Sequence, residues 1–216
     1  MLDLGQGSFS DLWRYRSWRD VAAVFVSHMH ADHNVDLIPL RHWVKYQNHG
    51  YGPALYGPTE LRRRLGEYQG ADAAFLSDLH GESLSPRTFT VGDLRVRAGR
   101  VTHIPDSFGF RIAAASGQGP GLAYSGDCSV ADDLLPLIVV GDTLLCEAGF
   151  GAGPADAAIH LTAQAAGSVA ARARAGNLIL THILEGRDPE AARAAAGALF
   201  TGPVSIAEPG LEVDIR

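Results

Sequence analysis

The chain has 216 residues, 46% hydrophobic and 19% charged, which excludes a disordered protein and suffices for one sizeable core. Its formal net charge of −6 provides no overall positive field for nucleic acid, although a local basic groove is not excluded. Two cysteines are too few for a disulfide framework, so we expect a reduced, cytoplasmic protein. The N-terminal residues have no basic head or apolar run and the apolar stretches are short, so we expect neither a signal peptide nor a membrane span.

The first part of the chain alternates apolar runs of strand length with helical patterns. Val21–Ser27 is a near-continuous apolar run, typical of a strand buried on both faces. Leu37–Tyr46 has helical spacing, Ala54–Tyr56 is expected to be a short strand, and Pro58–Glu67 a helix with proline near its start.

The sequence pattern of the rest of the chain predicts mainly strands, with helices between them. Strands are predicted at Thr88–Val91, Leu94–Val101, Phe108–Ala115, Gly121–Ser125, Thr143–Glu147, Asn177–Thr181, Val204–Ala207 and Leu211–Ile215. Helices are predicted at Asp132–Leu137, at Thr162–Ala175 with Thr162 as N-cap, and at Asp188–Phe200. No break in composition marks a linker, so we predict one α/β domain over residues 1–216.

The run His28-Met29-His30-Ala31-Asp32-His33 places three imidazoles and one carboxylate directly after the first apolar run. Such groups are costly in a dry interior, and a divalent metal ion compensates them directly. His103, Asp127 and His182 each follow the end of a predicted strand, where a rigid scaffold presents functional groups. Each of these three alone would more often be an ordinary loop residue, but together with the run they predict metal binding.

The HxHxDH run, followed by His103, the SGD of Asp127 and the THI of His182, resembles the metallo-β-lactamase superfamily from about Leu2 to the C-terminus. The resemblance implies a four-layered αββα sandwich with two divalent ions at one edge. Zinc is expected first, with Mn²⁺ or Fe²⁺ as alternatives. The implied ligands are His28, His30 and His103 for one ion, Asp32, His33 and His182 for the other, and Asp127 as the bridge. That family usually has one or two strands before the LDLG segment, so missing N-terminal strands are one alternative.

Two further segments resemble the ribonuclease Z-like phosphodiesterases of that superfamily. The run HLTAQAA from His160 resembles the H-[ST]-T-A-x-x-A segment of that branch, and LLCEA resembles its HEAT segment, with Glu147 at the acidic position. In that branch this pair acts on the departing oxygen, which implies catalytic roles for His160 and Glu147. The alternatives are an inert residue at a helix start for His160 and a buried carboxylate that orients a neighbour for Glu147.

The chain departs from that branch at Cys146 and Gly149, which replace the histidine and threonine of HEAT. Only 24 positions separate His103 from Asp127, too few for the tRNA-gripping arm of ribonuclease Z. The prediction is a dinuclear hydrolase in which a metal-bridging hydroxide attacks a phosphodiester, Asp32 orients the nucleophile and His160 assists the leaving group. The alternatives are a hydrolase of lactones, thioesters or sulfate esters, or an iron-dependent sulfur dioxygenase or redox protein.

The expected substrate is a small-molecule or nucleotide phosphodiester, with tRNA less favoured without the arm. A homodimer is expected by resemblance, and the arginine-, alanine- and glycine-rich composition favours a bacterial source. Trp13–Arg19 interleaves aromatic residues with arginines, which favours an amphipathic helix with its aromatics packed inward over a site for phosphate or a base. His42, Lys45 and His49 are candidates for the mouth of the pocket.

Overall fold

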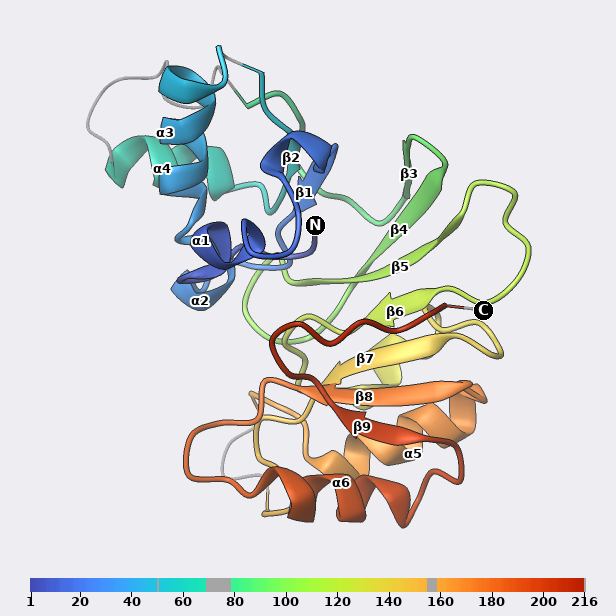
Figure 1. Cartoon of the computed structure of the whole chain (residues 1–216). Helices are drawn as coiled ribbons and strands as arrows, with labels where there is room; N and C mark the ends of the chain where they lie inside the picture. Colours follow the sequence, from blue (N-terminus) through green and yellow to red (C-terminus); the bar gives the residue numbers. More distant parts are fainter. Residues whose placement is uncertain (50, 69–78, 155–158, 216) are drawn as a thin grey trace. The chain divides into compact units, whose positions relative to one another are not determined.

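The computed structural model describes residues 1–49, 51–68, 79–154 and 159–215 (Figure 1). The chain forms two compact units, Met1–Leu84 and Ser85–Arg216. Each unit has its own hydrophobic core, one centred on residues such as Val24 and Leu40, the other on residues such as Leu144 and Leu178. The prediction of one domain over the whole chain stays a prediction.

The first unit surrounds a two-stranded parallel sheet, in which Ala23 pairs with Ala54. Its strands and helices are α1 (Ser8–Leu12), η1 (Trp18–Asp20), β1 (Ala23–Phe25), α2 (Ala31–Asn34), α3 (Leu37–Gln47), β2 (Ala54–Tyr56) and α4 (Leu61–Tyr68). All three residues of β1 are buried, as a continuous apolar run predicts. Helix α3 buries Leu37, Leu40 and Val44, the spacing of one apolar helix face.

The second unit is built on a seven-stranded sheet in the order β3-β4-β5-β6-β7-β8-β9. Its elements are β3 (Thr88–Val91), β4 (Leu94–Arg100), β5 (Phe108–Ala114), β6 (Leu122–Tyr124), η3 (Ala131–Leu134), β7 (Thr143–Glu147), α5 (Ala163–Ala173), β8 (Asn177–Thr181), α6 (Pro189–Gly197) and β9 (Val204–Ile206). Strands β3 to β6 pair antiparallel and β6 to β9 pair parallel. Consequently β4, β6, β7 and β8 all run in the same direction.

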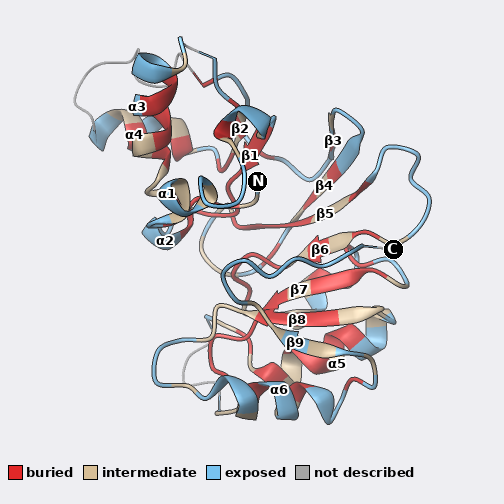
Figure 2. Cartoon of the chain, viewed as in Figure 1, coloured by how far each residue is buried: buried red, intermediate tan, exposed pale blue. Residues whose placement is uncertain are grey.

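Helices α5 and α6 complete the core of the second unit, and Figure 2 shows the buried side of α5 beside buried strands. The Thr162 side chain accepts a hydrogen bond from the backbone N–H of Ala165 (3.2 Å), so the predicted N-cap is confirmed. A Cβ at Gly167 would lie 2.4 Å from the Ala196 carbonyl oxygen, so this glycine permits the close approach of the two helices.

The structure corrects three sequence predictions. Leu211–Ile215 forms no strand, because its residues are exposed and do not pair with a neighbouring strand. The predicted helix at Asp132–Leu137 is only the short 3₁₀ turn η3. The third correction concerns the helix expected over Trp13–Arg19.

That helix is absent, because α1 ends at Leu12 and the Ser17 side chain accepts a hydrogen bond from Arg19 N (3.2 Å) to start the separate turn η1. Trp18 is 1% exposed, but Trp13 and Tyr15 are 43% and 46% exposed. Only one of the three aromatic side chains therefore packs inward.

A buried ion pair joins β5 to the turn before β7. Arg111 donates from Nε and Nη2 to the Asp142 carboxylate (2.6 and 2.8 Å), which also accepts from the N–H groups of Gly121 and Val139. We expect Asp142→Ala to lower the free energy of unfolding by about 3–5 kcal/mol, because Arg111 and two backbone N–H groups lose their acceptor.

Urea unfolding of Asp142→Ala measures this loss. The matched control is Asp132→Ala, which removes the exposed partner of Arg172 and is expected to leave the unfolding midpoint nearly unchanged. Equal, small losses in both variants would contradict a structural role for the buried pair.

Candidate metal centre

The segment after β1 carries the histidine-rich run of the first unit. His28 is buried and His30 precedes the first turn of α2, and the centroids of their two rings lie 4.8 Å apart. His28 Nε2 and His30 Nδ1 lie 3.1 Å apart, and Asp32 Oδ2 lies 3.5 Å from His33 Nε2. The structure therefore brings together the four predicted ligands of this unit.

Asp3 is a site residue that the sequence analysis missed. Its buried carboxylate accepts hydrogen bonds from the Ser27 hydroxyl (2.8 Å) and from His33 Nδ1 (2.8 Å). The Ser27 oxygen in turn lies 3.0 Å from His28 Nδ1. Because the Ser27 proton goes to Asp3, His28 donates from Nδ1, and both histidines keep a lone pair on Nε2. The only sequence signal was an acidic residue between two leucines.

The second unit gathers its polar residues at one edge of the sheet. Strands β4, β6, β7 and β8 run in the same direction, so their carboxyl ends meet at that edge, where open α/β sheets bind ligands. His103 follows β4, Asp127 follows β6 and His182 follows β8 directly, while Glu147 ends β7. The sheet therefore brings these strand ends together within this unit.

Asp127 is the centre of this group. Its Oδ2 lies 3.4 Å from His182 Nε2, 3.8 Å from His103 Nε2 and 3.9 Å from His160 Nδ1. Gly126 precedes it with a φ of 59°, so the turn after β6 favours glycine at this position. Potential ligand atoms of Asp127, His160 and His182 all lie within 4.8 Å of one another.

Glu147 is buried and holds His160 in place. Its Oε1 accepts hydrogen bonds from His160 Nδ1 (3.0 Å) and from Cys128 N (2.8 Å). Its Oε2 accepts from the N–H groups of Gly149 (2.9 Å) and Leu161 (3.1 Å). This carboxylate therefore has the geometry of a positioning residue: it fixes the ring of His160 and directs Nε2 away from itself.

Backbone strain accompanies two of these site residues. Asp3 and His182 have φ values of 52° and 54°, in the left-handed region that non-glycine residues rarely adopt. Such conformations persist where the surrounding structure holds them, and they concentrate at functional sites.

The donor chemistry of each unit fits a metal ion. His33 donates from Nδ1 to Asp3, and His103 donates from Nδ1 to the Ile159 carbonyl (2.7 Å). A metal-binding imidazole usually donates such a hydrogen bond from the ring nitrogen that does not bind the ion. Here Nδ1 donates, which leaves the Nε2 lone pair for the ion. Four of the predicted ligands lie in the first unit and three in the second, and their combination into one centre stays a prediction.

The two cysteines, Cys128 and Cys146, are buried free thiols in the second unit. Burial raises the pKa of Cys128 to about 12 and raises the pKa of Cys146 well above its ordinary value. A thiolate is the form that attacks or binds metal, so neither thiol is a candidate nucleophile.

Comparison with known proteins identifies the family. Residues 3–183 match the family described as the Beta-lactamase superfamily domain. The chain belongs to this superfamily. The predicted α/β class and metallo-β-lactamase fold are thereby confirmed, as is metallo-hydrolase at the level of the family.

Three relatives illustrate the range of the superfamily. An uncharacterized protein of Mycobacterium tuberculosis is 38% identical over 213 residues, 94% of this chain and 77% of the relative. YhfI of Bacillus subtilis, named a probable metallo-hydrolase, is 26% identical over 212 residues, 97% of this chain and 85% of that protein. Its crystal structure has a TM-score of 0.81 at 25% identity, over 97% of this chain and 85% of that one. Ribonuclease Z of Natronomonas pharaonis is 24% identical over 271 residues, 100% of this chain and 88% of the relative.

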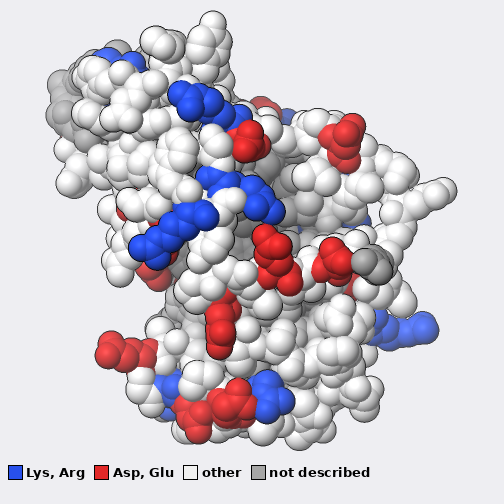
Figure 3. All heavy atoms as spheres, in the orientation of Figure 1, with Lys and Arg blue, Asp and Glu red and all other residues white. Residues whose placement is uncertain are grey.

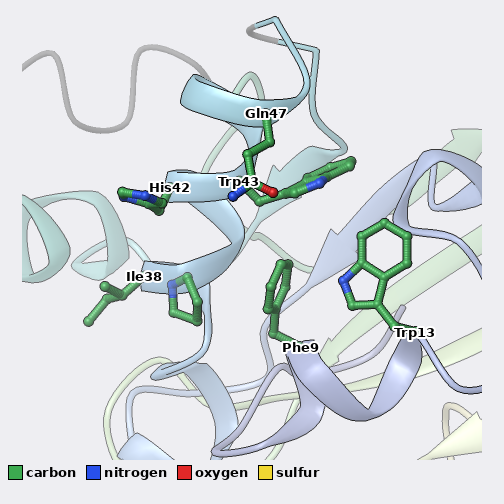
Figure 4. A pocket seen from close by; sticks show the side chains of 7 residues that line it. Phe9, Trp13, Ile38, His42, Trp43 and Gln47 are labelled. Atoms are coloured by element: carbon green, nitrogen blue, oxygen red, sulfur yellow. The ribbon is translucent and has the colours of Figure 1, made fainter.

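The first unit also has an aromatic groove of about 420 Å³. Side chains of α3, including Trp43 and Gln47, extend toward Phe9 and Trp13 (Figure 4). His42 lines this groove, and Lys45 and His49 are not among its lining residues. A place for these three residues at the mouth of the metal-site pocket stays a prediction.

Basic side chains gather on the face of the first unit drawn in Figure 3, while that face of the second unit carries both acidic and basic side chains. Arg14 pairs with Asp11 (3.4 Å), and the Arg19 guanidinium lies 5.9 Å from the Trp43 ring. A contact of these arginines with phosphate or a base, which the sequence favoured less than an amphipathic helix, stays an untested alternative. No helix in the described part of the chain is long and apolar enough to cross a membrane.

Proposed function

We propose that the protein is a dinuclear metal-dependent phosphodiesterase. The observation that carries the proposal is the Glu147–His160 pair (3.0 Å) placed beside Asp127, because it offers an oriented imidazole next to candidate metal ligands. The name of the Natronomonas relative, ribonuclease Z, supports the same chemistry, and YhfI supports a metallo-hydrolase.

The proposed ligands are those implied by the order of residues along the chain. They are His28, His30 and His103 for one divalent ion, Asp32, His33 and His182 for the other, and Asp127 as the bridge. Imidazole and carboxylate donors suit Zn²⁺ first, with Mn²⁺ or Fe²⁺ as alternatives. Bound divalent ions would supply an acidified water and neutralise charge on the phosphate oxygens.

The chain's own residues would then position and move protons. Hydrolysis adds a water oxygen to phosphorus and breaks the bond to the leaving oxygen, which needs a proton. His160 donates from Nδ1 to Glu147, so Nε2 is the atom that would hold the proton for the leaving oxygen. Asp32, whose carboxylate is half exposed, would orient the attacking water.

The same geometry allows a second role for His160. Its ligand atom lies within 4.8 Å of those of Asp127 and His182, so it is also placed to bind an ion. We expect His160→Ala to lower turnover about 10²- to 10⁴-fold while the metal content stays intact, because the variant loses proton transfer alone.

Turnover and metal content of His160→Ala, measured on the same sample, decide between the two roles. A loss of metal equal to the loss of turnover would show that His160 is a ligand. The matched control is His80→Ala, which removes an exposed imidazole and is expected to change neither quantity.

A substrate panel tests the reaction class. Protein of known metal content is compared on bis(p-nitrophenyl) phosphate, precursor tRNA, a lactone, a thioester and a sulfate ester. Hydrolysis of the small phosphodiester without tRNA processing is expected, since the chain has no room for the arm. Hydrolysis of only another ester class would overturn the proposal, and an iron absorption spectrum with no hydrolysis would favour a dioxygenase or redox protein.

Location in the cytoplasm, a bacterial source and a homodimer are proposals that rest on composition and resemblance.

A further inference from the structure

One face of the sheet carries an arginine-lined pocket that the proposed hydrolysis does not use. Its cavity of about 260 Å³ lies over β3, β4 and β5, and its lining residues are Thr88, Arg95, Arg97, Arg111, Ala113, Gly117 and Val139. None of these lining residues is acidic. The pocket is therefore a local concentration of positive charge in a chain whose formal net charge is −6.

The sheet register places these arginines side by side. Arg97 of β4 is directly opposite Arg111 of β5, and Arg95 lies two residues from Arg97, so it points to the same face. Like charges directly opposite each other destabilise an antiparallel pair. Asp142 compensates Arg111 with two hydrogen bonds (2.6 and 2.8 Å). Within the described ranges, neither Arg95 nor Arg97 forms an ion pair with a carboxylate.

The Arg97 guanidinium is held in place but incompletely bonded. Its Nη2 donates to the Pro136 carbonyl, whereas its Nε is buried and has no hydrogen-bond partner among the residues that the structure describes. A buried donor without an acceptor is costly, and an anion in the pocket would instead offset the positive charge of the guanidinium as a whole.

A glycine makes room for the second guanidinium. Gly117 has a φ of +69°, and a Cβ at this position would lie 3.3 Å from Arg95 Nη1. The turn between β5 and β6 thus leaves space beside Arg95, and Thr88 adds a hydroxyl to the same pocket.

We propose that this pocket binds a phosphate group, either as the free ion or as a phosphomonoester. The planar guanidinium fork matches the geometry of phosphate oxygens, and two uncompensated arginines match the charge of a phosphate dianion. The hydroxyl of Thr88 adds a donor that can also bond a phosphate oxygen. This binding site goes beyond the proposed hydrolysis and holds whether or not the chain cleaves phosphodiesters.

Calorimetric titration of the metal-loaded protein with inorganic phosphate and with AMP at low ionic strength tests the site. The double variant Arg95→Ala/Arg97→Ala is expected to bind phosphate at this site at least about tenfold more weakly. Arg172→Ala, which removes an exposed, ion-paired arginine, is the matched control and should bind as the wild type does. Loss of both ligands in the double variant would assign phosphomonoesters, and loss of phosphate alone would assign the free ion.

Two further measurements keep the proposal falsifiable. Without phosphate, the double variant should unfold at the same urea concentration as the wild type or a higher one, because the like-charge contact is relieved. Asp127→Asn separates this site from the candidate metal centre and should retain the phosphate binding that depends on Arg95 and Arg97. Unchanged phosphate binding in the double variant, or loss of all phosphate binding in Asp127→Asn, would overturn the proposal.

Discussion

Asp127→Asn is expected to lower phosphodiester turnover by about 10²- to 10³-fold or more, because the site loses the negative charge that would hold and balance the proposed metal ions. The carboxylate is buried, and its Oδ2 lies 3.4 Å from His182 and 3.8 Å from His103. Asparagine keeps the shape and one oxygen but not the charge, so the fold should persist while metal content falls.

Turnover, metal content by mass spectrometry and the urea midpoint are measured together for this variant. Asp93→Asn, in the exposed turn between β3 and β4, is the matched control and should leave all three unchanged. If Asp127→Asn kept its full complement of metal and its turnover, Asp127 would have no part in the centre.

Glu147→Gln is expected to affect both stability and turnover. Glu147 accepts hydrogen bonds from three backbone N–H groups and from His160 Nδ1. Glutamine replaces one acceptor oxygen by an NH₂ group that faces donors, so we expect a loss of about 3 kcal/mol in the free energy of unfolding. Turnover should fall about 10- to 100-fold, as when the support of a site imidazole is removed.

A double-mutant cycle separates positioning from a general loss of structure. If Glu147 acts only through His160, adding Glu147→Gln to His160→Ala should cost almost no further turnover, although stability still falls. The rate of each variant is measured without urea, at a temperature well below the unfolding transition of that variant. Multiplicative losses of turnover in the double variant would contradict the positioning role.

Sequence patterns predicted best where a residue's neighbours along the chain decide its environment. Thr143–Glu147 and Asn177–Thr181 were expected and observed with the same bounds, because each is an apolar run that ends at a polar residue. Asp127 and His182 each follow a predicted strand, and they meet because β6 and β8 run in the same direction in the sheet, which the sequence patterns did not specify.

Contacts between distant segments had no such signal. Asp3 lies 24 positions from Ser27 and 30 from His33, and no periodic pattern links an acidic residue to partners so far away. The opposite error arose at Leu211–Ile215, where a strand was predicted but pairing depends on a neighbouring strand that the local sequence does not specify.

The most direct test of the account is a titration of the metal-free protein with Zn²⁺, followed by the rate of bis(p-nitrophenyl) phosphate hydrolysis. The proposed ligands for two ions predict no hydrolysis without metal and a rate that reaches its plateau at two equivalents per chain. A plateau at one equivalent would contradict the dinuclear centre, and hydrolysis that is independent of metal would contradict the account as a whole.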